Sequence, residues 1–165
     1  MNDAQKTIPR GHRESLVSAI SAGFFFVLAG TIFIITPDLY NDAKTFFLDF
    51  KTVQVPNANI FLPVPASPDA HLAIYSAVKL FCIVWAIFEL VLLILRVIVH
   101  SAVDKEAETA SNIIFWSGAS YLIQTLLNEA TTITIWFTFW SEIIMLIGIT
   151  LVTRAVVLAA ARLKH

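Results

Sequence analysis

The sequence has little charge and almost no cysteine. Of its 165 residues, 14% are charged and 58% are hydrophobic, whereas an ordinary soluble domain has about 25% charged residues. The single cysteine, Cys82, can form neither an internal disulfide nor a cysteine-rich metal centre. The 11 basic residues are balanced by 12 acidic ones, which excludes a nucleic-acid binder that works by net charge. The high apolar content excludes an intrinsically disordered chain.

Sequence motifs for catalysis and cofactor binding are missing as well. The chain has no Gly-rich phosphate loop, no H-E-x-x-H and no C-x-x-C, and no spacing typical of a nucleophile elbow. Its 4 histidines lie in separate segments, which disfavours a membrane oxidase with a histidine-rich metal site. We therefore expect no catalytic residues, no metal and no cofactor.

Long apolar runs are what the sequence does contain. A membrane-spanning helix needs about 20 mostly apolar residues, and the stretches that qualify are 15–36, 72–100, 112–131 and 132–161. The sequence therefore predicts an all-α integral membrane protein, a single membrane domain built as a four-transmembrane-helix bundle. A cleaved signal peptide is the alternative for the first stretch, but its apolar part exceeds the usual core of about 7–15 residues.

The basic residues are distributed unevenly between the two sides of the predicted bundle. The N-terminal tail, the inner loop 101–111, the adjacent helix ends and the basic C-terminal end 162–165 together contain Lys6, Arg10, Arg13, Arg96, Lys105, Arg154, Arg162 and Lys164. The other side has Lys44 and Lys51, with Lys79 in the outer part of the second span. The positive-inside rule then predicts an N-in/C-in protein of the cytoplasmic membrane.

The predicted external cap, residues 37–71, is the only sizeable segment outside the bilayer. Its first part has apolar residues at helical spacing, which favours a short amphipathic helix on the membrane surface. Alternation in 52–55, turn residues at 56–59 and a second apolar run at 60–62 predict a small β-hairpin. The acidic residues of the cap match no calcium-binding loop, so we expect a solvated surface.

Charged residues within the spans are the most informative feature of the sequence. Each costs about 2.5–3.5 kcal/mol at the membrane centre, so such residues usually face protein or water. At about 100° per residue, Lys79, Glu89 and Arg96 fall on one stripe of the second span. A second stripe on the third span contains Gln124 and Asn128. The residues that we predict to line an intramembrane polar site are Lys79, Glu89, Arg96, Gln124, Asn128, Glu142 and Arg154.

Two of these residues are deep carboxylates. Glu89 and Glu142 have no cationic partner at their own depth in the predicted spans. We expect Glu89 or Glu142 to have a raised pKa, or to bond across helices to Gln124, Tyr121 or Thr138.

Polar side chains in small bundles often hold helices together without conducting anything. Our leading hypothesis is therefore a non-enzymatic membrane module, which acts as a homo-oligomer or as an accessory subunit of a larger membrane complex. The alternative is a channel or transporter for ions, protons or small solutes that uses Glu89 and Glu142. A lipid-active membrane enzyme is the second alternative, which needs a nucleophile in a polar cleft. The expected partners are the lipid bilayer and other subunits, and no nucleic acid.

Two segments, FKTVQVPNANIFLPVPASPDAH and ETASNIIFWSGASYLI, resemble parts of an uncharacterised family of small archaeal multi-pass membrane proteins. The resemblance covers most of the chain. It implies an archaeal cytoplasmic membrane, but it implies no activity and no site residues, because the family brings none.

Overall fold

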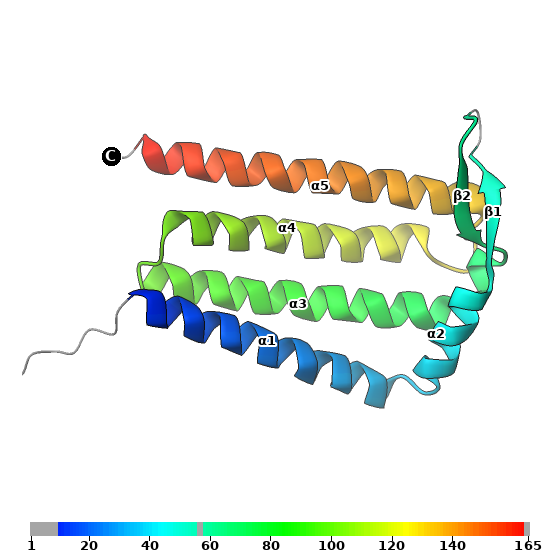
Figure 1. Ribbon diagram of the computed structural model, residues 1–165, viewed down its shortest axis with the longest axis horizontal. Helices are drawn as coiled ribbons and strands as arrows, with labels where there is room; N and C mark the ends of the chain where they lie inside the picture. Colours follow the sequence, from blue (N-terminus) through cyan, green and yellow to red (C-terminus); the bar gives the residue numbers. More distant parts are fainter. Residues whose placement is uncertain (1–9, 56–57, 164–165) are drawn as a thin grey trace, which may run out of the picture.

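Long helices that run side by side dominate the computed structural model, which describes residues 10–55 and 58–163 (Figure 1). In chain order the elements are α1 (Arg10–Ile35), α2 (Leu39–Leu48), β1 (Phe50–Gln54), β2 (Phe61–Pro65), a 3-10 helix (Pro68–Ala70), α3 (Leu72–Ile98), α4 (Val103–Leu126) and α5 (Ile133–Arg162). The predicted basic residues Lys6 and Lys164 and the turn residues 56–57 lie outside the described residues.

The long helices form one layer in the order α1, α3, α4, α5 (Figure 1). Short connections make α3, α4 and α5 alternate in direction, as expected of helices joined by tight turns. We call the end of the layer that carries α2 and the strands the cap end. The opposite end, where α1 begins and α5 finishes, is the terminal end.

Three of these helices are long and apolar enough to cross a membrane: residues Ser15–Ile35 of α1, all of α3 and all of α5. This finding supports the prediction of a membrane-embedded protein. The exception among the long helices of the described chain is α4, which is more polar and has neighbours on both sides. Part of this polar composition is sheltered by the neighbouring helices, since Thr109, Ser111 and Ser120 of α4 are buried against protein.

Close packing between α4 and α5 depends on Gly118. A Cβ atom at this position would lie 2.6 Å from Cδ1 of Leu146 on α5, well inside van der Waals contact. The absence of a side chain therefore lets the two helices approach. The buried side chains of α4 are otherwise mostly small: Ala107, Thr109, Ser111, Ala119 and Ser120.

Two predicted boundaries were wrong. The inner loop was expected to cover 101–111, but α4 already begins at Val103, so the connection is short. Asp104 and Glu106 lie in the first turn of α4, where acidic side chains stabilise a helix N-terminus. The third span was expected to reach 131, but α4 ends at Leu126. Hydrogen bonds of Thr131 to the backbone of Leu126 and Asn128 close the turn to α5 instead.

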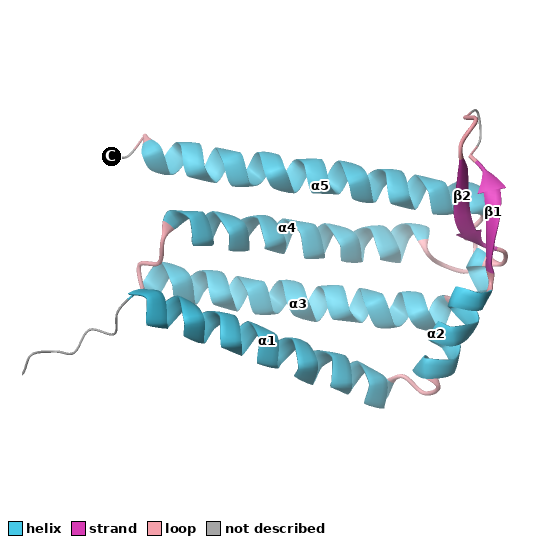
Figure 2. Cartoon of the chain, viewed as in Figure 1, coloured by secondary structure: helices cyan, strands magenta, loops and turns pink. Residues whose placement is uncertain are grey.

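The cap has the predicted amphipathic helix and hairpin (Figure 2). Strands β1 and β2 pair antiparallel, with Thr52 opposite Pro63. Since this sheet has just two strands in the described chain, the prolines of β2 lie in an edge strand, where proline is tolerated.

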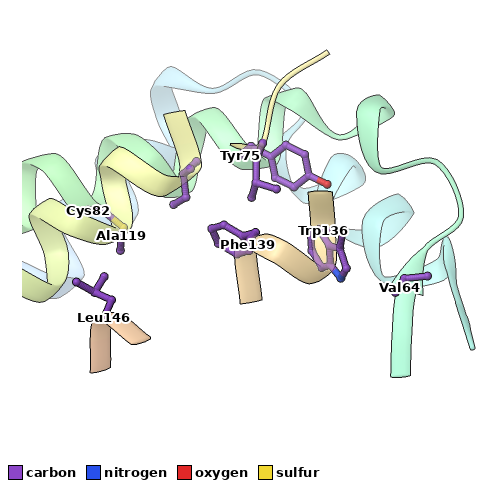
Figure 3. Close-up of a cluster of buried hydrophobic side chains, with 9 residues drawn as sticks. Val64, Tyr75, Cys82, Ala119, Trp136, Phe139 and Leu146 are labelled. Carbon is purple, nitrogen blue, oxygen red and sulfur yellow. The ribbon is translucent and has the colours of Figure 1, made fainter. Parts of the chain in front are cut away.

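A buried cluster joins the cap to the helices (Figure 3). Val64 of β2 is 0% exposed and belongs to the same cluster as Tyr75 of α3 and Trp136 of α5. Further from the cap, Cys82, Ala119 and Leu146 continue this cluster between α3, α4 and α5. The cap is therefore continuous with the core of the layer.

Candidate functional site

Polar side chains connect α3 and α4 at three levels along their length. Near the cap end, Nζ of Lys79 donates to Oε1 of Gln124 over 2.6 Å. At the middle level, Nδ2 of Asn112 donates to Oε1 of Glu89 over 3.4 Å. Near the terminal end, Nη1 of Arg96 donates to Oγ1 of Thr109 over 2.5 Å and to the carbonyl oxygen of Lys105 over 2.6 Å. We call these contacts the α3–α4 polar ladder.

The ladder shows that the stripe predicted on the second span faces α4. Residue numbers rise along α3 as those of their partners fall along α4, as antiparallel helices require. The partners expected for Glu89 were nevertheless wrong, because its carboxylate accepts a hydrogen bond from Asn112. Gln124, one of the expected partners, accepts a hydrogen bond from Lys79 instead. The sequence showed which residues share a face, but the register between the helices decides which side chains meet.

A polar pocket of about 370 Å³ lies beside the ladder towards the terminal end. Residues from α1, α3 and α4 line it: Ser18, Ser21, Glu89, Arg96, Lys105, Glu108, Thr109 and Asn112. Glu89 is only 7% exposed, and Nζ of Lys105 lies 2.8 Å from Oε2 of Glu108. The pocket thus combines two carboxylates with two cations, which lowers the cost of keeping charge within a membrane protein.

A second polar pocket of about 420 Å³ lies at the cap end, on α3 and on the connection between α4 and α5. Its polar lining includes Ser76, Lys79, Gln124, Asn128 and Glu129, and no residue of α1. Oδ1 of Asn128 accepts from the N–H of Ala130 over 2.9 Å, so this side chain also shapes the turn. The second pocket therefore uses a different set of elements from the first.

Buried small side chains lie between the levels of the two pockets. Cys82 and Ala86 of α3 are buried and lie between Lys79 and Glu89 along the helix, and Ala119 of α4 belongs to the same buried cluster as Cys82. The predicted site residues of α3 and α4 therefore line two different pockets, one with Lys79, Gln124 and Asn128 and the other with Glu89 and Arg96.

The two predicted residues on α5 lie apart from both pockets. Arg154 pairs with Asp104 of α4, with Nη2 and Oδ1 2.8 Å apart. Glu142 is half-buried, and among the described residues it has no hydrogen-bond or ion-pair partner. The expected contact of Glu142 with Tyr121, Gln124 or Thr138 is therefore absent from this part of the chain, and Thr138 bonds its own backbone at Thr134.

The sequence analysis missed a side-chain hydrogen bond that fastens the cap. Nε2 of His71 lies 2.9 Å from Oδ2 of Asp49, and the same oxygen accepts from the N–H of Ser67 over 2.9 Å. The hydrogen bond from His71, followed by that from Ser67, lowers the pKa of Asp49 below its ordinary value. The two residues are 22 positions apart, and no local pattern links them, because the hairpin between them brings them together.

An apolar groove of about 410 Å³ runs between α1, α2 and α3, with Ile32, Phe33, Phe47 and Phe81 among its lining residues. It contains none of the predicted site residues. Within the described residues, no group of three or more His, Cys, Asp or Glu side chains is arranged to hold a metal ion.

Comparison of the chain with known protein families, characterised proteins and solved structures finds no match. The similarity to an archaeal membrane protein family therefore stays a prediction from the sequence segments alone.

Proposed function

We propose that the chain is a non-enzymatic integral membrane module that acts as a homo-oligomer, or as an accessory subunit of a membrane complex. The observation that carries this proposal is Glu142. It is a half-buried carboxylate on α5, one of the three helices apolar enough to span a membrane, and it has no polar partner within the described chain. A carboxylate left against lipid is costly, whereas an adjoining subunit supplies a polar environment.

The small interior of a single copy supports the same proposal. Only 11% of the most apolar segment of α1 and 6% of that of α5 are buried. A single copy therefore exposes most of its helix surface. The layer encloses little interior volume in which one copy could form a functional site of its own.

We propose that four helices cross the membrane, with α4 as the fourth. The position of α4 between α3 and α5 supports this proposal, because a helix flanked by two spanning helices shares their depth. At about 1.5 Å per residue, its 24 residues extend about 36 Å, enough for the hydrocarbon layer. The basic residues near the terminal end favour a cytoplasmic location for both termini.

The test of self-association is a mass measurement on the full chain in lipid nanodiscs, by light scattering combined with single-molecule photobleaching. We expect two or more copies per particle at low protein-to-lipid ratio. A single copy at every ratio, in particles that contain no other protein, would overturn the homo-oligomer.

A channel that uses Glu89 is the second candidate, and the pocket at the terminal end favours it because Glu89, although buried, lines this pocket together with Arg96 and Lys105. Proteoliposome flux of protons and small cations tests this candidate. Flux that Glu89→Gln abolishes supports a channel, and the absence of flux under any applied gradient removes it.

A further inference from the structure

One face of α4 is left uncovered by its neighbours. Residues 110, 114, 117, 121 and 124 follow one another at alternate spacings of four and three, which places them on this face, and Asn128 lies in the turn just beyond the end of α4. We call these residues the α4 seam: Ala110, Ile114, Ser117, Tyr121, Gln124 and Asn128. Neither neighbour of α4 covers the seam, since Tyr121 is 67% exposed and Ser117, Gln124 and Asn128 are also exposed.

The directions of the other contacts explain why the seam is free. Gly118 faces Leu146 of α5, and Asn112 faces Glu89 of α3. At about 100° per residue, Ser117 is rotated about 100° around the α4 axis from Gly118, which faces α5. In the other direction, it is rotated about 140° from Asn112, which faces α3. The seam therefore points away from both neighbouring helices.

The composition of the seam does not suit a lipid-facing surface. Serine, tyrosine, glutamine and asparagine side chains in a spanning segment normally face protein. Amides and hydroxyls both donate and accept hydrogen bonds, so two copies of the same amide can bond each other. A second, parallel α4 would place each seam residue next to its own counterpart at equal depth.

Charges of opposite sign flank the seam. On one side, Lys79 of α3 reaches the seam through its hydrogen bond with Gln124. On the other side is Glu142 of α5. Around their own helix axes, Glu142 on α5 and the seam on α4 are both rotated in the same sense away from the residues of the α4–α5 contact. Because the two helices are antiparallel, rotation in the same sense brings both to the same side of the layer.

The two charges also lie at similar depth. The rings of Tyr75 and Trp136 are 6.3 Å apart, which sets a common level for α3 and α5. Towards the terminal end, Lys79 is four residues from Tyr75 and Glu142 is six residues from Trp136. Because α3 and α5 run in the same direction, these offsets place the two charges about 6 Å and about 9 Å from the common level. Within one copy, α4 separates the two residues.

We propose that the α4 seam is the interface between two copies of this chain, related by a two-fold axis parallel to the helices. Because α3 and α5 flank α4, the rotation places α3 of each copy opposite α5 of the other. Lys79 of each copy then lies beside Glu142 of the partner subunit, and the pair forms twice. This inference rests on the proposed self-association and specifies its surface, its symmetry and the partner of Glu142.

Charge reversal tests the paired residues. Either K79E or E142K alone places like charges opposite each other at two symmetric positions, so we expect the dimer in nanodiscs or mild detergent to weaken about tenfold or more. The double variant K79E/E142K restores opposite charges and should recover most of the affinity. Loss of dimer in the double variant equal to the summed losses of the single variants would overturn the pairing.

Disulfide cross-linking tests the surface independently of charge. In a Cys82→Ala background, Ser117→Cys should form a dimer on mild oxidation in membranes. The matched control is Ile144→Cys, which is 69% exposed but lies about 200° around α5 from Glu142, and it should stay monomeric. Cross-linking at position 144 but not at 117, in a chain that still forms dimers, would overturn this interface and leave the proposed self-association intact. A strictly monomeric chain would overturn both.

Discussion

Helices α1 and α4 are held in the layer by different kinds of contact. The α1 helix is apolar, and it contacts α3 through the buried side chains Leu28 and Ile32 and through aromatic rings, such as Phe24 stacked on Phe88 with centroids 4.0 Å apart. The α4 helix is more polar, and it is joined to α3 by the polar ladder and to α5 by the close approach at Gly118. In lipid, apolar surface gains little by being covered, so packing and interhelical hydrogen bonds decide which helices stay together.

The largest expected effect is at Gly118. Gly118→Leu places a side chain where a Cβ atom already meets Leu146 at 2.6 Å, so α4 and α5 must separate. Overpacking of this kind lowers the free energy of unfolding by about 1–3 kcal/mol, measurable by reversible unfolding in mixed micelles. The matched control is Gly30→Leu on α1, where a Cβ atom would meet nothing within 4 Å. Equal losses for both variants would contradict the contrast between α1 and α4.

The next effect concerns the ladder. Arg96→Leu removes the hydrogen bonds to Thr109 and to the carbonyl oxygen of Lys105. Interhelical polar contacts in membranes contribute about 0.6 kcal/mol on average and up to about 1.7 kcal/mol, so the free energy of unfolding should fall by about 1–2 kcal/mol. Arg162→Leu serves as the control, because Arg162 is exposed at the end of α5. A loss at Arg162 as large as that at Arg96 would remove the argument for the ladder.

A smaller effect is expected on α1. Leu28→Ala leaves a gap against α3, since Leu28 is 6% exposed. Because lipid and protein interior are both apolar, the loss comes from packing alone, and we expect about 1 kcal/mol or less. The comparison variant is Ile34→Ala, at a position that is 85% exposed and should be neutral. A cost at Leu28 greater than that at Arg96 would reverse our ranking of the two attachments.

The smallest effect is the pH dependence of the cap. Since the pKa of Asp49 is lowered in the folded protein, its contribution to stability is complete above the unfolded pKa of about 3.9 and disappears as the pH falls through the lower, folded value. Limited proteolysis of the cap should therefore accelerate below about pH 4. In Asp49→Asn this acid-dependent change should be absent. Cleavage of both proteins with the same pH profile would assign the effect to other carboxyl groups.

The sequence by itself determined the apolar helices, the amphipathic α2 and the hairpin, because each depends on a local period of hydrophobicity that chain geometry imposes. It also placed Lys79, Glu89 and Arg96 on one face of α3, since a helix turns by a fixed angle per residue.

The tertiary structure decided what those faces meet. The pairing of Glu89 with Asn112, the separation of the two polar pockets and the free seam of α4 all depend on the register and order of the packed helices. A helical period fixes directions around one axis, but it contains no information about which neighbour lies in each direction. For the same reason the Asp49–His71 pair had no signal in the sequence, because the fold of the hairpin between them sets their distance.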